Sequence, residues 1–178
     1  MRATPATTAA RRRIRAHTAK MNTNELDAAA VRFPPPLVYL AAVVLGGLLQ
    51  ALAFPLPIGL SLGVRIGAGA ASALLGIALV AAAFGLFRRT GQDPAPWKST
   101  PQIISTGIYR VTRNPMYLGM GLIQAGIGIG FGNGWIVALL PLVLALIYLT
   151  AIRHEEAYLE RKFGAGYVAY KQSVRRWL

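Results

Sequence analysis

Two stretches in the second half of the chain hold the side chains that could do chemistry. The first, T-G-I-Y-R-V-T-R-N-P-M-Y-L-G-M-G over 106–121, crowds two arginines and two tyrosines around the start of an apolar run. The second, over 153–178, begins where another apolar run ends and carries Glu155 and Glu156, in a chain with only 6 acids. Guanidinium groups, carboxylates and aromatic rings around a glycine-rich bend indicate a site, because a plain membrane anchor needs only charge and an aromatic belt.

The paired acids need partners, because a carboxylate at the edge of an apolar core is costly when it is unpaired. We expect Arg110 and Arg113 to supply the charge, provided that the two apolar runs are antiparallel neighbours. An ordinary arginine–glutamate pair at a helix end would use the same residues, and this alternative stays open. Pro115 suits the first turn of a helix, where its missing amide is not needed, and Asn114 before it is a candidate cap.

Several chemistries are excluded by composition. The chain has no cysteine, which rules out disulfides, thiolate catalysis and cysteine-based metal sites. With only His17 and His154, a histidine metal cluster is not expected either, so we predict no metal. The net charge of +13 could indicate nucleic-acid binding, but the basic residues lie between apolar runs, which fits a membrane protein better. We therefore expect no nucleic-acid partner.

Four uncharged or nearly uncharged apolar runs must position these residues. They predict an all-α integral membrane protein with about four transmembrane helices and a C-terminal amphipathic helical tail. The expected spans are 37–54, 64–87, 116–131 and 135–152, with the tail over 153–178. The third run is short for a full span. Gly132-Asn133-Gly134 between the last two runs predicts a tight antiparallel hairpin, and Pro141 predicts a kink. Recurring glycines in the runs predict close helix packing.

The tail should form two short helices. The fourth helix should continue over 153–163 with Gly164 as its C-cap, followed by a second helix over 167–174. We expect an apolar face of the tail to lie on the membrane surface. The residues expected on that face are Leu159, Phe163, Tyr170, Val174 and Trp177.

The distribution of Lys and Arg predicts the orientation of the chain. The segment before the first span, the connection between the second and third spans, and the tail are rich in basic residues, whereas the other two connections hold one and none. The positive-inside rule then places both termini and the 106–121 stretch in the cytoplasm. The high content of Ala, Arg and Gly is typical of a bacterial protein, which predicts a bacterial inner membrane.

The chain divides into an N-terminal segment, 1–36, and a single membrane domain, 37–178. The first twenty residues are basic, lack the apolar region of a secretory signal, and are expected to be a disordered tail or to precede a true start at Met21.

The two stretches resemble one known superfamily. G-I-Y-R-V-T-R-N-P-M-Y-L-G is similar to the G-x-Y-x-x-x-R-H-P-x-Y-x-G signature of the isoprenylcysteine carboxyl methyltransferase and phospholipid methyltransferase superfamily. E-E-A-Y-L-E-R-K-F-G-A-G-Y-V-A-Y resembles that superfamily's E-E-x-x-L-x-x-x-F-G-x-x-Y-x-x-Y block. The resemblance covers roughly 101–178. One departure is Asn114, where the signature usually has histidine; asparagine does not titrate near neutral pH, so a histidine base is absent there.

The resemblance implies an integral membrane enzyme that uses S-adenosylmethionine, bound in a cytosolic pocket. The implied cofactor-binding residues are Gln102, Ile103 and Ile104 through mainly backbone contacts, Tyr109, Asn114, Pro115, Met116 and Tyr117 as walls, and Glu155 for the ribose hydroxyls or the ammonium group. The implied catalytic residues are Arg113, Arg153 and Glu156. An arginine would position an acceptor carboxylate, and Arg153 is the arginine nearest before the paired acids.

The acceptor stays open among several lipophilic molecules. The resemblance favours O-methylation of an isoprenylcysteine-type carboxylate, which is already ionised and needs no general base. A phospholipid amine or a small thiol would need one, with Glu156 or Tyr117 as candidates. The bacterial composition favours a small lipophilic acceptor over a lipidated protein. Membrane lipids are the expected surroundings.

Functions of other classes remain as alternatives. A non-catalytic scaffold or assembly factor would bind no cofactor. A transporter is disfavoured, because the spans offer only Gln50, Gln124 and Ser72 as polar groups at depth. Membrane sterol reductases share the C-terminal pattern and bind a nicotinamide cofactor, but they are larger than this chain.

Overall fold

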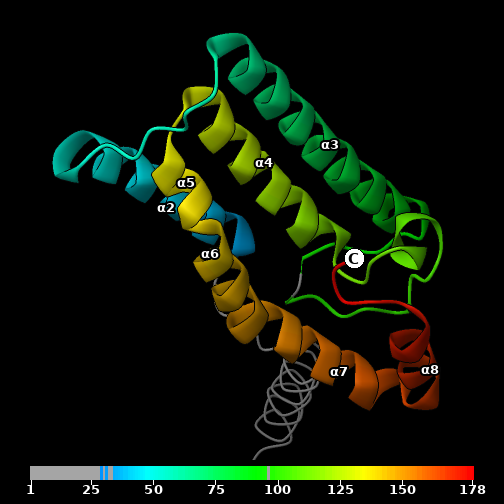
Figure 1. The fold of residues 1–178 in the computed structure, drawn as a ribbon. Coiled ribbons are helices and arrows are strands. Elements are labelled where there is room, and N and C mark those ends of the chain that lie inside the picture. The colour runs from blue at the N-terminus through cyan, green and yellow to red at the C-terminus, as the bar shows by residue number, and fades with distance from the viewer. Residues whose placement is uncertain (1–28, 30, 32–33, 96) are drawn as a thin grey trace, which may run out of the picture.

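The computed structural model describes residues 29, 31, 34–95 and 97–178, and these residues are organised into helices and connecting loops (Figure 1). The α-helices are α2 (Pro35–Leu48), α3 (Leu62–Arg89), α4 (Pro115–Phe131), α5 (Gly134–Ala138), α6 (Leu140–Ile147), α7 (Arg153–Phe163) and α8 (Ala165–Ser173). Two π-helical turns, Leu49–Ala53 and Tyr148–Ile152, extend α2 and join α6 to α7. The predicted all-α class is confirmed.

Three helical segments of the described chain are long and apolar enough to cross a membrane, and they match the predicted first, second and fourth spans. They are Pro35–Ala53, Leu62–Arg89 and Gly134–Phe163. The predicted third span is α4, which is apolar but has only 17 residues. At 1.5 Å per residue it rises about 26 Å, less than the roughly 30 Å of a bilayer's hydrocarbon core. The expected count of four full-length spans is thus not confirmed.

Helices α3 and α4 lie side by side and antiparallel, with their backbones in close contact (Figure 1). A Cβ atom built on Gly76 would lie 2.4 Å from the carbonyl oxygen of Gly119, and one built on Gly126 would lie 2.6 Å from that of Gly69. Such distances leave no room for a side chain. The predicted close packing through small residues is confirmed for this helix pair.

The predicted hairpin and kink are both present. Gly132 ends α4 in the left-handed conformation, with φ of 66°, and the side chain of Asn133 caps α5 by accepting a hydrogen bond of 3.2 Å from the amide of Ile136. The helix is interrupted between α5 and α6, just before Pro141. These features turn the chain back beside α4.

Beyond the hairpin, α4 and the α6–α7 rod diverge, and loops occupy the space between their far ends (Figure 1). The tail forms α7 and α8 on either side of Gly164, as predicted. Its predicted apolar membrane face is wrong in part: Leu159 and Tyr170 line a cavity between the helices, and Trp177 packs against the core. These side chains turn inward because the loops leave an apolar hollow between the helices.

The predictions for residues 1–20, including the choice between Met1 and Met21 as the start, lie outside the described residues. Of the N-terminal segment 1–36, the structure describes Ala29, Val31 and 34–36.

Candidate active site

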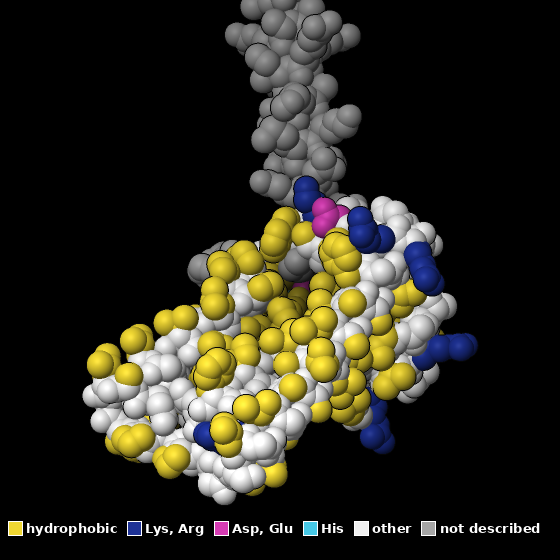
Figure 2. Space-filling model, turned by 90° about the horizontal axis from the view of Figure 1, so that it is seen from above, with side chains coloured by type: hydrophobic (Ala, Val, Ile, Leu, Met, Phe, Trp, Pro, Cys, Tyr) yellow, Lys and Arg dark blue, Asp and Glu magenta, His cyan; other side chains and the backbone are white. Residues whose placement is uncertain are grey.

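A cavity of about 340 Å³ lies where the start of α4 meets α7, α8 and the loop that follows α3. This volume falls within the roughly 300–1,000 Å³ of small-molecule sites. The structure brings all nine of the predicted cofactor-binding residues to its wall: Gln102, Ile103, Ile104, Tyr109, Asn114, Pro115, Met116, Tyr117 and Glu155. Figure 2 shows hydrophobic side chains gathered around a hollow in the surface. Most of the wall is aromatic or aliphatic, which favours a ligand with flat or apolar parts.

A buried ion cluster lies behind the α4 side of the cavity. Glu156 Oε1 lies 3.0 Å from Arg113 Nη1, and Arg176 binds the same carboxylate through two hydrogen bonds of 3.0 and 2.9 Å. The side chains of Arg113 and Glu156 are 9% and 10% exposed. The hydrogen bonds to Glu156 raise the pKa of Arg176, whose guanidinium also lies 4.9 Å above the ring of Tyr148. Glu156 is therefore committed to two cations and is poorly suited to act as a base.

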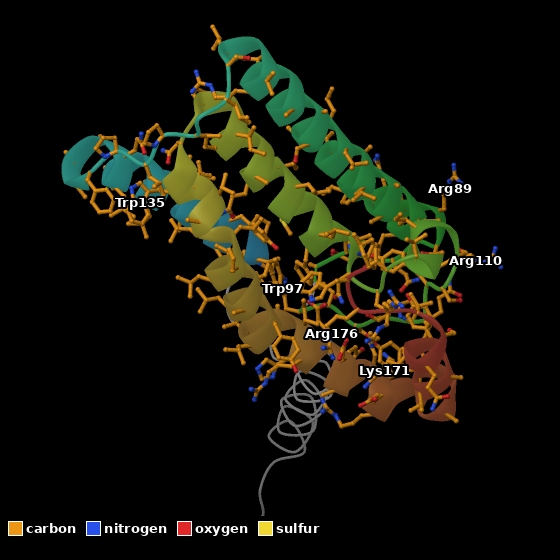
Figure 3. All side chains as sticks on the ribbon, in the orientation of Figure 1. Arg89, Trp97, Arg110, Trp135, Lys171 and Arg176 are labelled. Atoms are coloured by element: carbon orange, nitrogen blue, oxygen red, sulfur yellow. The ribbon has the colours of Figure 1, made fainter. Side chains whose placement is uncertain are left out.

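The predicted pairing of the acids is correct for Arg113 and wrong for Arg110. Figure 3 shows Arg110 at the outer edge of the molecule, directed away from Arg176. Arg110 is exposed because it ends the 3-10 turn Gly107–Arg110, three residues before the chain turns inward at Arg113. The second cation comes instead from Arg176 at the other end of the tail.

Glu155 faces the cavity and has a different partner. The hydroxyl of Tyr117 donates a hydrogen bond to Glu155 Oε1. None of the ion pairs within the described part of the chain includes Glu155. Tyr117 is held in turn, because its backbone carbonyl accepts a 2.9 Å hydrogen bond from the hydroxyl of Tyr39 on α2. The cavity wall thus contains a carboxylate with a neutral partner.

The last residues of the chain hold the start of α4 in place. The amide of Arg113 donates to the carbonyl of Arg175 at 3.0 Å, and the side chains of Thr112 and Asn114 both donate to the carbonyl of Arg176 at 3.0 Å. Asn114 precedes α4 as predicted, but its side chain makes no capping hydrogen bond. Its Nδ2 donates to the tail, and its side-chain oxygen accepts no hydrogen bond from the first turn of α4, so the predicted capping role is wrong.

Tyr170 on α8 holds the part of the cavity wall that contains Tyr109. The hydroxyl of Tyr170 donates a 2.7 Å hydrogen bond to the carbonyl of Tyr109. Burial raises the pKa of Tyr170 to about 12, more than the nearby Arg113 lowers it, so the hydroxyl keeps its proton at neutral pH. The contact couples α8 to the first stretch that the sequence singled out.

The third predicted catalytic residue, Arg153, is not part of this arrangement. It is exposed and does not line the cavity. On α7 the residues that do so are Glu155, Tyr158 and Leu159. Because each residue turns an α-helix by about 100°, a side chain two positions before Glu155 points about 200° around the axis from it.

Sequence reasoning missed two residues of the site. Arg176 was not singled out because no local pattern separates it from the exposed Arg175, and its partners are 20 or more residues away. Gln92 was missed because it belongs to neither motif, although it is buried in the cavity wall.

Comparison with known proteins agrees with this geometry. A family model described as phospholipid methyltransferase matches residues 64–166, which is 103 of the 178 residues. The chain belongs to the phospholipid methyltransferase family. The match runs from α3 into α8 and confirms the superfamily that the two motifs resemble. Together with the apolar helices, it indicates an integral membrane methyltransferase.

The chain is also similar to an uncharacterized protein of Haemophilus influenzae. The two are 42% identical over 65 residues, which make up 35% of this chain and the whole of that protein. No solved structure matches the chain.

Proposed function

We propose that this protein is an integral membrane methyltransferase that uses S-adenosylmethionine and methylates a lipophilic acceptor. The observation that carries the proposal is the charge arrangement of the cavity. Within the described residues, Glu155 presents a carboxylate that has no cationic partner, and Arg113 presents a guanidinium whose Nε has no hydrogen-bond partner. A third charged residue of the described wall, Asp93, is exposed and accepts a hydrogen bond from the backbone amide of Ala95. Opposite charges at Glu155 and Arg113 on one largely apolar wall call for a ligand that carries both.

S-adenosylmethionine fits this arrangement. It carries two cationic groups, a sulfonium and an ammonium, which Glu155 can attract, and one carboxylate, which Arg113 can bind. The ion cluster behind the wall has two guanidinium groups and one carboxylate, Glu156, so it keeps one net positive charge for an anionic group. The flat adenine would meet the aromatic part of the wall. The fit supports the family's usual cofactor.

A nicotinamide cofactor fits less well. Its pyrophosphate needs cations or a glycine-rich helix start. Among the described lining residues, Arg113 is the one Lys or Arg side chain, and it is shared with Glu156. The reductase alternative is therefore disfavoured by charge.

The residues of the wall would act by binding, orienting and excluding water. When bound, the cofactor supplies an electrophilic methyl group on its sulfonium. Tyr117 fixes the orientation of the Glu155 carboxylate, and Glu156 with Arg176 fixes that of Arg113. The apolar wall keeps water away from the reacting groups, so most of the rate acceleration would come from alignment and desolvation.

The acceptor that we favour is a carboxylate on a lipophilic molecule. A carboxylate is ionised at neutral pH and needs no general base. The structure offers few bases, because Glu156 is bound to two cations and the Tyr117 hydroxyl already donates a hydrogen bond to Glu155. The second candidate is a phospholipid amine, which the family description favours. Its deprotonation would fall to Glu155.

We also propose that the cavity faces the cytoplasm. The loops and tail around it carry most of the basic residues of the described chain, and the positive-inside rule places such segments there. A soluble cofactor could then enter from the cytoplasm while the acceptor enters from the bilayer.

Titration calorimetry of the detergent-purified protein with S-adenosylmethionine tests the proposal. We expect wild type to bind, and Glu155→Gln to bind about tenfold or more weakly, because it loses the charge that attracts the cationic ligand. Glu160→Gln is the matched control, since Glu160 lies on the same helix but pairs with Lys171 outside the cavity. A folded wild type that does not bind, or equal losses in both variants, would contradict the proposed site.

A further inference from the structure

Gln92 is a buried polar residue of the cavity wall that belongs to neither family motif. It lies three residues beyond the end of α3. Its backbone amide donates a 2.9 Å hydrogen bond to the carbonyl of Phe87, which fixes the backbone at this position. The residue is only 7% exposed and lines the cavity. Its side-chain Oε1 has no hydrogen-bond partner among the residues that the structure describes. A buried acceptor without a donor is unusual, because such groups are nearly always paired.

The orientation of the Gln92 amide follows from its neighbour Thr90. The hydroxyl of Thr90 donates to the carbonyls of Leu86 and Phe87, at 3.0 and 3.1 Å, so its proton is already used. It can therefore only accept the 3.0 Å hydrogen bond from Gln92, which makes the contacting atom of Gln92 the donor Nε2. The atom left without a partner must then be the oxygen, a neutral acceptor.

The wall near this acceptor is mostly flat and apolar. Asp93, the next residue, also lines the cavity, but it is exposed and its Oδ1 accepts a 2.9 Å hydrogen bond from the backbone amide of Ala95. The rings of Phe87 and Tyr109 meet edge to face with centroids 6.2 Å apart, and both line the cavity. Trp97, on the same loop as Gln92, also lines it. A ligand that carries a flat ring, with an uncharged hydrogen-bond donor at the edge of that ring, would fit this part of the wall. A charged ammonium would instead be drawn to a carboxylate, either Glu155 or Asp93.

We propose that the Gln92 carbonyl accepts a hydrogen bond from the 6-amino group of the adenine in bound S-adenosylmethionine and so makes the site select adenine over a 6-oxo base. The inference rests on the proposed function. In an inosyl analogue the 6-amino group is replaced by an oxygen, so two acceptors would face each other in a buried place. A binding site with a buried hydrogen-bonding group discriminates strongly against ligand analogues that cannot pair with that group.

The test is calorimetry with the two demethylated ligands, S-adenosylhomocysteine and S-inosylhomocysteine, on the full chain in detergent. We expect wild type to bind the adenosyl form about tenfold or more tightly, as one buried hydrogen bond implies. Gln92→Met, which keeps the length of the side chain and removes the acceptor, should weaken adenosyl binding and leave inosyl binding nearly unchanged. The ratio of the two dissociation constants should then fall toward one.

Thr90→Val supplies a second variant that leaves Gln92 in place. Without the Thr90 hydroxyl the amide is free to turn and present its NH₂, so the ratio should again fall, and inosyl binding should strengthen. A merely structural role would weaken both ligands equally. An unchanged ratio in Gln92→Met would overturn this inference while leaving the cofactor site intact, whereas a folded wild type that binds neither ligand would overturn both.

Discussion

Glu155 and Glu156 are adjacent on α7 but differ in what surrounds them. Glu156 lies between two guanidinium groups, whereas Glu155 has a phenol for a partner and a largely apolar cavity in front of it. A carboxylate without a cation in such a place costs stability in the unliganded protein, and that cost is offset only when a cationic ligand binds. The difference suggests that Glu156 stabilises the fold, whereas Glu155 binds the ligand.

Neutralising the two acids should therefore have opposite effects on stability. Glu156→Gln leaves two guanidinium groups around a neutral amide and should lower the free energy of unfolding by about 2–4 kcal/mol. Glu155→Gln removes an unpaired charge and should leave it unchanged or raise it by up to about 1 kcal/mol. Thermal unfolding in detergent without ligand measures both. Equal destabilisation by the two variants would show that Glu155 is a structural residue.

The role of Arg176 can be tested beside its neighbour. Arg176→Met removes the two hydrogen bonds to Glu156 but leaves Arg113 in place, and the arginine is about one-third exposed, so we expect a modest loss of about 1–2 kcal/mol. Arg175→Met is the control, because Arg175 is exposed and contributes its backbone carbonyl to the start of α4. Thermal midpoints that fall equally in both variants would speak against the ion cluster.

At the scale of elements, the close contact of α3 with α4 sets the frame on which the site is built. Gly76→Ala places a methyl group 2.4 Å from the carbonyl oxygen of Gly119, and separating the helices should cost about 1–3 kcal/mol. Gly85→Ala on the same helix has open space around its Cβ and should be neutral or slightly stabilising, since alanine is the better helix former. The comparison is made by thermal unfolding in detergent. A Gly76→Ala protein as stable as Gly85→Ala would mean that the helices are not packed this closely.

Much of this frame could be predicted from the sequence because its signals are local. Uncharged runs, Gly132-Asn133-Gly134 and Gly164 mark where helices run and end, and helix α7 has the predicted bounds of 153–163. The length of α4 was also visible as a short apolar run. By contrast, the π-helical turn Tyr148–Ile152 before the paired acids has no such signal, because the apolar pattern passes through it unchanged.

The candidate site was predictable to the extent that its motifs are contiguous. The nine expected cofactor-binding residues meet at one cavity, although their roles remain predictions. The pairing of the acids was only half predictable, because Arg176 reaches Glu156 through a return of the tail that depends on tertiary contacts with Thr112 and Asn114. The prediction of capping by Asn114 was wrong for a related reason: its Nδ2 donates to the distant carbonyl of Arg176, a tertiary contact that no local pattern indicates.

On the scale of the whole molecule, the apolar helices and the basic loops divide the protein into a membrane part and a polar end. Large hydrophobic side chains are exposed along α2 and α3, as suits contact with lipid, and the cavity lies at the end where the basic residues gather. The lipophilic acceptor and the soluble cofactor would thus approach the same cavity from different phases.

The proposed orientation can be tested directly, because the chain has no cysteine. Single cysteines would be introduced at Arg110, which follows the cavity residue Tyr109, and at Gly59, in the loop between the first two spans; both positions are exposed. In intact bacterial cells a membrane-impermeant maleimide should label Gly59→Cys and spare Arg110→Cys, which should react only after the membrane is opened. The reverse pattern would place the cavity outside the cytoplasm.

Transfer of a labelled methyl group tests the central claim most directly. Membranes that contain the protein would be incubated with S-adenosylmethionine labelled in its methyl group, and label in the lipid extract would be counted for wild type, Glu155→Gln and Glu160→Gln. The account predicts label with wild type and Glu160→Gln and a loss of about tenfold or more with Glu155→Gln. Label that alkali releases as volatile methanol would identify a methyl ester, whereas label that stays non-volatile after alkali would identify a methylated amine or thiol. A folded, cofactor-binding wild type that transfers no label to any lipid would contradict the account.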